Sequence, residues 1–572
     1  MKKYILSAVA AVGALAMTSC SDFLKPTPEG TPYTTSYFLN DQQAIDAVDG
    51  FLRDMTSSDP WYGREYQWIM YETNMGVVGK TKGWTTVLNH NYAGNSEQEP
   101  IAEPFYCATR YAARANWVVQ ELKKKQKTTA LSYIEKRSLG EALFWRGLYH
   151  WVIAFRHGLP SQGVPFINYE DIEGGYDDRI PTQQATVMDD YKMVIKDLEE
   201  AATYLPTIAQ YSDPEKGRAS ADAAVGLQAK VYAYWAAWDE SQWQNVINTV
   251  DKLEKAPYNR KLIDDYEDLF TYDTKKWANS EEILGIYCHA QNTTTGGTEW
   301  AGVMFENKGW GKWNGWGQGK PTLDLYETFV EDDDKLIDPA KGNVRKHRTM
   351  LEYGDKFRYL GEDFYYYSSS DLETGFMCAK YIRGFELGTD LKSCMEAGGC
   401  NEGGDWPITT CVVPILRFAD CMLLRAEAYI MTGKAADAAN DINKIRNRGN
   451  VKSLDHTPTM ADIYHERRAE LAFEICDPFQ DLRRWSISSN AEIKKLALAE
   501  LTSKPRVRHY ADRSKAGDWT EEGKFIPNTD FTIGLYEDSD YERTWSETKV
   551  VYPYPQGEVD KANGLLKQNP GY

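Results

Sequence analysis

The chain has 572 residues, of which 84 are acidic and 65 are basic, so its formal net charge is -19 at neutral pH. This excess of negative charge excludes nucleic acid and disfavours strongly anionic polymers, and it leaves a neutral ligand as the better match. The length is sufficient to bury a large core in one large domain or in two intergrown domains.

Residues 1–19 have the pattern of a secretion signal. Lys2 and Lys3 precede an apolar run that is too short to span a bilayer comfortably. A small residue stands before Cys20, as in a bacterial lipoprotein signal, which implies cleavage before Cys20 and acylation of its thiol. A plain secretion signal that is cut elsewhere is the alternative. Residues 20–40 are rich in proline and are expected to form a semi-extended, lipidated tether.

Helical periodicity begins after the tether and recurs in pairs of segments. Residues 241–255 and 434–448 share one spacing of apolar positions, and both are expected to be amphipathic helices. The expected helix pairs, in chain order, are 41–55 with 104–125, 135–158 with 185–206, 221–238 with 241–255, and 418–433 with 434–448. Paired helices with alanine-rich inner faces and a unit of about 34 residues resemble tetratricopeptide repeats.

Between residues of about 256 and 410, and again after about 500, the helical periodicity fades. We therefore expect a mostly α fold, in which a tetratricopeptide-like helical-repeat scaffold carries long irregular, loop-rich insertions. We divide the mature chain into residues 41–255, the N-terminal part with helical repeats, and residues 256–572, the C-terminal part with the binding loops and the last repeat. Ligand residues are expected in the insertions, because loops on a rigid scaffold commonly carry binding.

Nine cysteines are present, and eight remain if Cys20 is acylated. Cys394 and Cys400 lie in a glycine-rich stretch, CMEAGGC, where a short disulfide could close or both thiols could stay free. The others lie in apolar contexts and are expected to be buried small residues: Cys107, Cys288, Cys378, Cys411, Cys421 and Cys476.

Six blocks of the mature chain occur in a characteristic order. They read SCSDFLKPTP, GEALFWRGLYHWVIAFRHG followed by GVPFI, GRASADAAVGLQAKVYAYWA, PILRFADCMLLRAEAY, ERRAELAFEICDPFQDLRRW and VYPYPQGEVDKANGLLKQNPGY. Together they resemble the SusD/RagB family, and the last two blocks are the most specific. The resemblance implies a SusD-like surface lipoprotein of the outer membrane that captures glycan fragments and hands them to a SusC-like TonB-dependent transporter. It also implies no catalytic residues, and no cofactor is expected.

The charges of the ERRAEL and DLRRW blocks alternate at helical spacing. Because mixed-sign charges at this spacing pair readily, we expect ion pairs that fix helices to each other rather than a ligand site. The members of this set are Glu466, Arg467, Arg468, Glu470, Asp481, Arg483 and Arg484.

Residues 309–317 read GWGKWNGWG and concentrate three tryptophans among glycines. So many glycines predict a loop without a regular helix or strand. An indole face can stack on the C–H face of a pyranose, which makes Trp310, Trp313 and Trp316 the leading candidates for a glycan platform. In the family the site is an arc of aromatic residues, in which Trp316 matches the middle-loop position while Trp84 and Trp300 match by location.

Short amides and one lysine near these rings are expected to bond glycan hydroxyls: Asn292, Asn314, Lys312 and Gln318. For any single tryptophan, a packing role in the irregular part of the protein is the alternative. The aromatic run at residues 364–367 is a weaker candidate, with packing or contact with the transporter as its alternatives.

Two other function classes are weighed. A surface glycosidase needs two facing carboxyls, but the acidic run at residues 331–334 is expected to be a solvated loop. The chain contains no HExxH, GxSxG or phosphate-loop motif, and its eight histidines lack metal-ligand spacing, so neither catalysis nor a metal site is predicted. A receptor for peptides is the second alternative, because helical repeats commonly bind peptides.

Overall fold

A computed structural model of the chain describes residues 38, 40–55, 73–77, 96, 99–166, 182–212, 215–270, 274–276, 278–287, 308–310, 313–314, 319–359, 362–366, 374–381, 412–474, 478–512, 517–522, 524–536, 543 and 545–572. Within these ranges the fold is mostly helical, with fourteen α-helices and short strands. The helices are α2 (Asp41–Met55), α5 (Glu99–Gln126), α6 (Tyr133–His157), α7 (Val187–Tyr204), α8 (Ala221–Ala236), α9 (Trp243–Glu254), α11 (Leu323–Val330), α12 (Val344–Thr349), α14 (Phe418–Met431), α15 (Ala435–Arg448), α16 (Met460–Leu471), α17 (Pro478–Ser486), α18 (Ala491–Thr502) and α19 (Gln556–Lys561).

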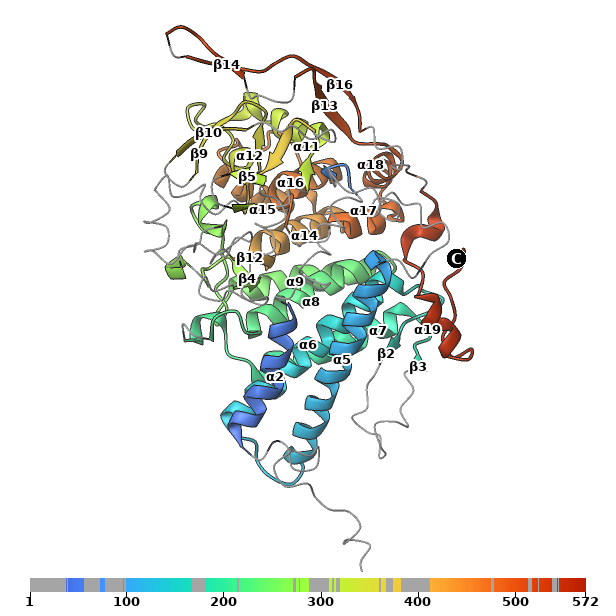
Figure 1. Cartoon of the computed structure of the whole chain (residues 1–572). Helices are drawn as coiled ribbons and strands as arrows, with labels where there is room; N and C mark the ends of the chain where they lie inside the picture. Colours follow the sequence, from blue (N-terminus) through green and yellow to red (C-terminus); the bar gives the residue numbers. More distant parts are fainter. Residues whose placement is uncertain are drawn as a thin grey trace, which may run out of the picture.

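The long helices stack in chain order. Helices α5 to α9 pack each on the next, α9 packs on α14, and α14 packs on α15 and α16 (Figure 1). Each predicted helical segment corresponds to a helix, so the expected helical scaffold is confirmed. The first predicted pair, α2 with α5, differs from the prediction because α2 packs against α6 as well as against α5.

The apolar stripes predicted for two helices face the core. In α9 all five predicted positions are buried, namely Trp243, Val246, Ile247, Val250 and Leu253. In α15 the later positions Ala438, Ile442 and Ile445 are buried, while Ala435 and Ala439 are half-buried. Burial of one stripe per helix is what holds stacked helix pairs together.

Local signals fix where the helices begin and end. Helix α6 starts with a capping box, in which Ser132 Oγ accepts from Glu135 N–H and Glu135 Oε2 accepts from Ser132 N–H, both at 3.0 Å. Ser220 caps α8 through a hydrogen bond from Ala223 N–H at 3.0 Å. Gly433 has a φ of 76° between α14 and α15, a conformation that favours glycine at the end of a helix.

The strands that the structure describes form eight two-stranded antiparallel sheets. The pairs are β1 (Gly76–Val77) with β7 (Lys320–Pro321), β2 (Pro165–Phe166) with β3 (Thr182–Gln183), β4 (Glu282–Ile286) with β12 (Val413–Arg417), β5 (Lys308–Trp310) with β6 (Trp313–Asn314), β8 (Met350–Glu352) with β11 (Phe376–Cys378), β9 (Lys356–Tyr359) with β10 (Glu362–Tyr365), β13 (Arg506–Tyr510) with β16 (Phe531–Leu535), and β14 (Gly517–Trp519) with β15 (Phe525–Pro527).

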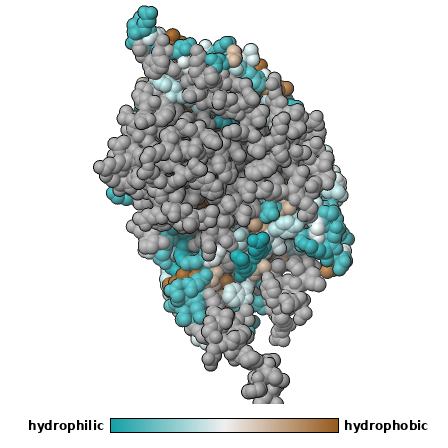
Figure 2. Space-filling view, viewed as in Figure 1, coloured by the Kyte–Doolittle hydropathy of each residue, from teal (hydrophilic) through white to brown (hydrophobic). Residues whose placement is uncertain are grey.

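The sheet of β13 and β16 lies at the upper edge of the molecule as drawn, next to β14 (Figure 1). Three hydrophobic residues here expose more than half of their surface to solvent, namely Ile526 of β15 and Ile533 and Leu535 of β16. Brown, hydrophobic atoms accordingly appear along this edge in Figure 2.

Residues 545–572 return to the first half of the chain. Asn569 Nδ2 donates to His157 O at 2.8 Å and to Tyr552 O at 2.7 Å, and Tyr552 N–H donates to Arg156 O at 2.7 Å. The ring of Tyr554 stacks on that of His157, with centroids 5.2 Å apart. The block that ends NPGY therefore joins the end of α6 to the rest of the fold.

The prediction of burial is confirmed for three cysteines, namely Cys107, Cys378 and Cys421. The remaining predictions for cysteine fall outside the described residues. Among the helices that the structure describes, none combines the length and the apolar character needed to cross a membrane.

Candidate functional site

The charged blocks of the sequence form a buried ionic core. Arg417, at the end of β12, donates from Nη1 to Glu281 Oε1 at 2.7 Å and to Glu470 Oε1 at 2.6 Å. Its Nε donates to Glu474 Oε2 at 2.7 Å. All seven predicted members of the set are buried: Glu466, Arg467, Arg468, Glu470, Asp481, Arg483 and Arg484. The expected ion pairs are confirmed for six of them, while Arg483 donates from Nη2 to Lys549 O at 2.9 Å.

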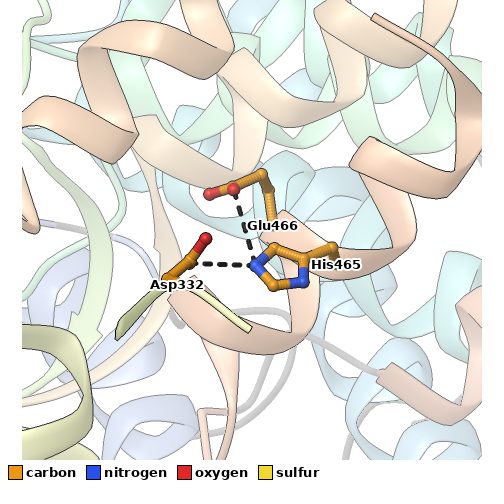
Figure 3. Close-up of side chains that lie close together, drawn as sticks. All are labelled: Asp332, His465 and Glu466. Carbon is orange, nitrogen blue, oxygen red and sulfur yellow. Dashed lines mark hydrogen bonds and ion pairs between the residues drawn. The ribbon is translucent and has the colours of Figure 1, made fainter. Parts of the chain in front are cut away.

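A second cluster brings Asp332, His465 and Glu466 together (Figure 3). His465 Nε2 lies 3.0 Å from Asp332 Oδ2 and 3.8 Å from Glu466 Oε1. Burial alone would lower the pKa of His465, but hydrogen bonds to Asp332 and Glu331 raise that pKa to about 9. Burial would likewise raise the pKa of Asp332, but the hydrogen bond from His465 and the nearby arginine charges lower it to about 2.

These three side chains have the donor atoms of a metal site, but the carboxylates are already neutralised. Arg345 Nη1 donates to Glu466 Oε2 at 2.7 Å, and Arg446 Nη2 lies 3.2 Å from Asp332 Oδ1. A cation would meet two guanidinium groups, so the cluster is better suited to an ion-pair network than to metal binding. The expectation that residues 331–334 form a solvated run is wrong for Asp332, which is fully buried because these cations hold it.

Two segments that are far apart in the sequence meet in one small sheet. Strand β1 pairs with β7, and Val77 and Lys320 are partners in the register. Trp84 lies 84 - 77 = 7 residues after Val77, and Trp316 lies 320 - 316 = 4 residues before Lys320. The pairing therefore joins the roots of two chain segments that each carry a predicted platform residue.

The sheet of β1 and β7 is fixed by hydrogen bonds of the residues that flank its strands. Asn74 N–H donates to Glu500 Oε1 at 2.7 Å, and Asn74 Nδ2 donates to Ser503 Oγ at 2.9 Å. Thr322 N–H donates to Met75 O at 3.2 Å. Hydrogen bonds on both sides of the pair thus fix the positions of β1 and β7 in the fold.

Strand β7 is entered through Gly319, which has a φ of 68°. This left-handed conformation costs other residues about 1 to 2 kcal/mol, which explains a glycine at this root position. The ammonium of Lys320, whose side chain is buried, lies 5.8 Å from the ring centroid of Tyr366.

The tryptophan segment contains a short hairpin. Trp310 of β5 pairs with Trp313 of β6, and Lys308 pairs with Asn314. The prediction that this segment lacks any regular strand is therefore wrong. The residues between the strands, Gly311 and Lys312, form a Gly-X pair of the kind that two-residue hairpin connections favour. The register also shifts between Lys308 and Trp310, where a glycine stands in the strand.

The structure places part of the predicted site. Trp310, Trp313 and Asn314 have their backbones in the hairpin of β5 and β6. The other predicted residues lie outside the described residues: Cys20, Trp84, Asn292, Trp300, Lys312, Trp316 and Gln318. The segment that carries Asn292 and Trp300 begins shortly after β4, which pairs with β12 in the centre of the fold.

The aromatic run at residues 364–367 has a packing role at its third position. Tyr366 is fully buried, donates from its hydroxyl to Phe376 O at 2.9 Å, and lies edge-on to Tyr353. Tyr365 is half-buried in β10. For Tyr366 the packing alternative is confirmed.

Sequence reasoning missed the sheet of β1 and β7. Each strand has only two residues, so no alternation of apolar and polar positions could reveal it. The one local signal was the glycine before Lys320, which marks a turn but does not identify the partner strand.

Comparisons with known proteins agree on one family. Residues 280–572 match the model described as "SusD family", and residues 22–233 match the model described as "Starch-binding associating with outer membrane". The SusD-like protein P25 of Formosa agariphila is 24% identical over 509 residues, which cover 82% of this chain and 87% of that protein.

Solved structures share the fold at lower sequence identity. A SusD-like protein from Bacteroides fragilis is 20% identical, with a TM-score of 0.70 over 94% of this chain and 98% of the other. Surface glycan-binding protein A from Bacteroides uniformis is 19% identical, with a TM-score of 0.65 over 93% of this chain and 99% of the other. Because a family model covers more than half of the sequence and the helical architecture agrees, the chain belongs to the SusD family.

Proposed function

We propose that the protein is a lipid-anchored surface protein of the outer membrane that binds neutral oligosaccharides or polysaccharides and is not an enzyme. The support is the match of residues 22–233 to a starch-binding, outer-membrane-associated family and the similarity to a surface glycan-binding protein of Bacteroides uniformis. The acidic balance of the chain agrees with a neutral rather than an anionic glycan.

The observation that carries the proposal is the pairing of Val77 with Lys320. At about 3.3 Å per residue, Trp84 and Trp316 lie within roughly 25 Å of this common root. Two tryptophans from loops far apart in sequence can therefore meet a single glycan chain. The hairpin that contains Trp310 and Trp313 adds two more indoles from the same part of the sequence as Trp316.

Stacking energies set the affinity that this arrangement supports. Burying about 60 to 100 Å² per ring at about 25 cal/mol per Å² gives around 1.5 to 2.5 kcal/mol before ordering costs. Two or three such rings correspond to dissociation constants from micromolar to millimolar, on the order of -4 to -8 kcal/mol. This range permits capture followed by release.

The test is calorimetric titration of the purified protein against a panel of neutral glycans. Trp316→Ala, Trp84→Ala and Trp300→Ala are each expected to weaken binding by roughly 10- to 50-fold, as the loss of one stacked ring implies. Tyr133→Ala is the matched control, because it removes an exposed ring from the distant start of α6. Glycan binding that none of the tryptophan variants weakens would contradict the proposed platform.

The same titration separates the other candidate functions. Binding to a peptide digest but to no glycan would replace the glycan with a peptide ligand. Oligosaccharide products above the uncatalysed background would contradict a binding protein without enzymatic activity.

Delivery to a SusC-like TonB-dependent transporter is the second half of the proposal, and it rests on family membership. Affinity purification of the tagged protein from its own outer membrane is expected to recover a TonB-dependent transporter in stoichiometric amount. Recovery of the protein alone from mildly solubilised membranes would contradict this partnership.

A further inference from the structure

One end of the molecule carries basic side chains that are unusual for so acidic a chain. Helix α5 ends and helix α6 begins at the lower end in Figure 1. Residues 123–137 read KKKQKTTALSYIEKR and contain six basic residues against one acidic residue. We call Lys124, Lys127, Lys136 and Tyr133 the basic tip.

Half of the six cations are used within the fold. Lys123 Nζ bonds Glu200 at 2.8 Å, Lys125 bonds Glu135, and Arg137 bonds Glu215. The other three, Lys124, Lys127 and Lys136, are exposed and have no acidic partner among the residues that the structure describes. One further acid lies at this end, because Asp41 Oδ1 accepts from Ser132 Oγ at 2.5 Å.

An aromatic side chain accompanies the free lysines. Tyr133, the first residue of α6, exposes 65% of its side-chain surface, the highest fraction among the large hydrophobic residues that the structure describes. A ring with a polar hydroxyl suits the boundary between water and lipid headgroups, where tyrosine and lysine are both favourable.

The chain enters the fold at the same end. Lys125 Nζ donates to Phe38 O at 2.8 Å, so the segment that follows Cys20 arrives beside the basic tip. The 38 - 20 = 18 residue steps from Cys20 to Phe38 can span at most about 60 Å at roughly 3.3 Å each. If Cys20 carries the lipid, as the proposed function requires, this end is the one that the tether connects to the membrane.

We infer that the basic tip is a second contact with the membrane, at which Lys124, Lys127 and Lys136 bind phosphate-bearing lipid headgroups while Tyr133 enters the interface. The lysines are exposed rather than gathered in a cavity, which suits a layer of headgroups better than a single free anion. Acidic residues elsewhere repel that layer weakly, because charges more than about 10 Å away are screened at physiological salt. The contact restricts the orientations that the tether alone would allow.

The test measures vesicle binding by a protein that lacks the acyl chain on Cys20. The mature chain with Cys20→Ser is mixed with vesicles of phosphatidylcholine, with or without phosphatidylglycerol, and the bound fraction is measured by co-sedimentation at low and high salt. Binding is expected only with phosphatidylglycerol and is expected to fall as salt rises. The combined variant Lys124→Gln, Lys127→Gln, Lys136→Gln is expected to lose on the order of 100-fold in partitioning, at about fivefold per lysine.

The matched control makes the same change in net charge on helices far from the tip. Lys434, which precedes α15, Lys444 of α15 and Lys495 of α18 are exposed, and their combined replacement by glutamine is expected to leave vesicle binding unchanged. Equal binding by the tip variant and the control, or no wild-type binding to anionic vesicles, would overturn the inference. Displacement by inorganic phosphate at constant ionic strength would also overturn it, by identifying a free-anion site.

Two further measurements test the proposed function independently of the basic tip. Glycan titration of the same tip variant is expected to match the wild type, and the mass of the protein isolated from its own membranes reports acylation of Cys20. A protein that loses glycan binding or lacks the lipid contradicts the proposed function, whereas loss of vesicle binding alone concerns the basic tip.

Discussion

The ionic core predicts a large and specific cost for removing one buried charge. Glu470 of α16 is fully buried and accepts from Arg417 Nη1 at 2.6 Å, with Arg448 also bonded to it and Arg345 Nη1 at 3.7 Å. Burial alone would raise the pKa of Glu470, but the charges of Arg448, Arg417 and Arg345 lower it from 4.5 to about 2. At about 1.4 kcal/mol per pKa unit, the ionised carboxylate contributes roughly 3 kcal/mol at neutral pH.

Glu470→Gln is therefore expected to lower the free energy of unfolding by about 3 kcal/mol, because it leaves buried guanidinium groups short of one negative charge. The assay is urea denaturation of the purified protein at neutral pH, followed by tryptophan fluorescence. Glu331→Gln is the control, since its side chain is 68% exposed and its pair with His465 is expected to contribute about 1 kcal/mol or less.

The pH dependence of stability gives the same prediction a second readout. A lowered pKa means that the contribution of Glu470 is complete above pH 4.5 and is lost as the pH falls toward 2. The wild type should lose stability more steeply than Glu470→Gln across that interval. If the variant costs less than about 1 kcal/mol at neutral pH, or if the two acid profiles run parallel, the reasoning from buried charge is refuted.

Three further predictions concern other parts of the fold. Asn569→Ala removes both donors that serve His157 O and Tyr552 O and is expected to cost about 3 kcal/mol in thermal unfolding; an unchanged melting temperature would count against this role. The pKa of His465 is raised to about 9, so the stability that its charged form contributes is complete below pH 6.5 and is lost as the pH rises through 9. His465→Gln is expected to reduce this loss of stability at alkaline pH. An unaltered pH profile of stability would be inconsistent with the pairing of His465 with its acidic neighbours. Gly319 has a φ of 68°, so Gly319→Ala is expected to lower the free energy of unfolding by about 1 to 2 kcal/mol. It is also expected to weaken glycan binding, because Gly319 directly precedes β7. A variant as stable as the wild type would show that the position tolerates a side chain.

Much of the scaffold could be predicted from the sequence because helical burial repeats along the chain. The stripes of α9 and α15 recur every three or four residues, so a local pattern reports a tertiary contact. The ionic core could be predicted in part, since Glu466 and Glu470 are four residues apart and share one face of α16. Their partners Arg345, Arg417, Arg446 and Arg448 come from other segments, which the local pattern does not identify.

The roots of the candidate site could not be predicted, because they depend on contacts between distant segments. Val77 and Lys320 pair over only two residues, and nothing in either neighbourhood identifies the other. Asp332 shows the same limit, since its acidic neighbours indicated solvent while Arg345 and Arg446 hold it inside the protein. The hairpin of Trp310 and Trp313 was hidden by glycines, which disfavour strands in general but permit a tight connection.

The hydrogen bonds of Asn569 place a constraint on the order of assembly. The carbonyl of His157 accepts from a donor 412 positions later in the chain, so the end of α6 cannot complete its hydrogen bonds until residue 569 has been synthesised. A chain that lacks residues 545–572 would therefore have an unpaired helix end at His157 and would lose the stack of Tyr554 on the ring of this residue.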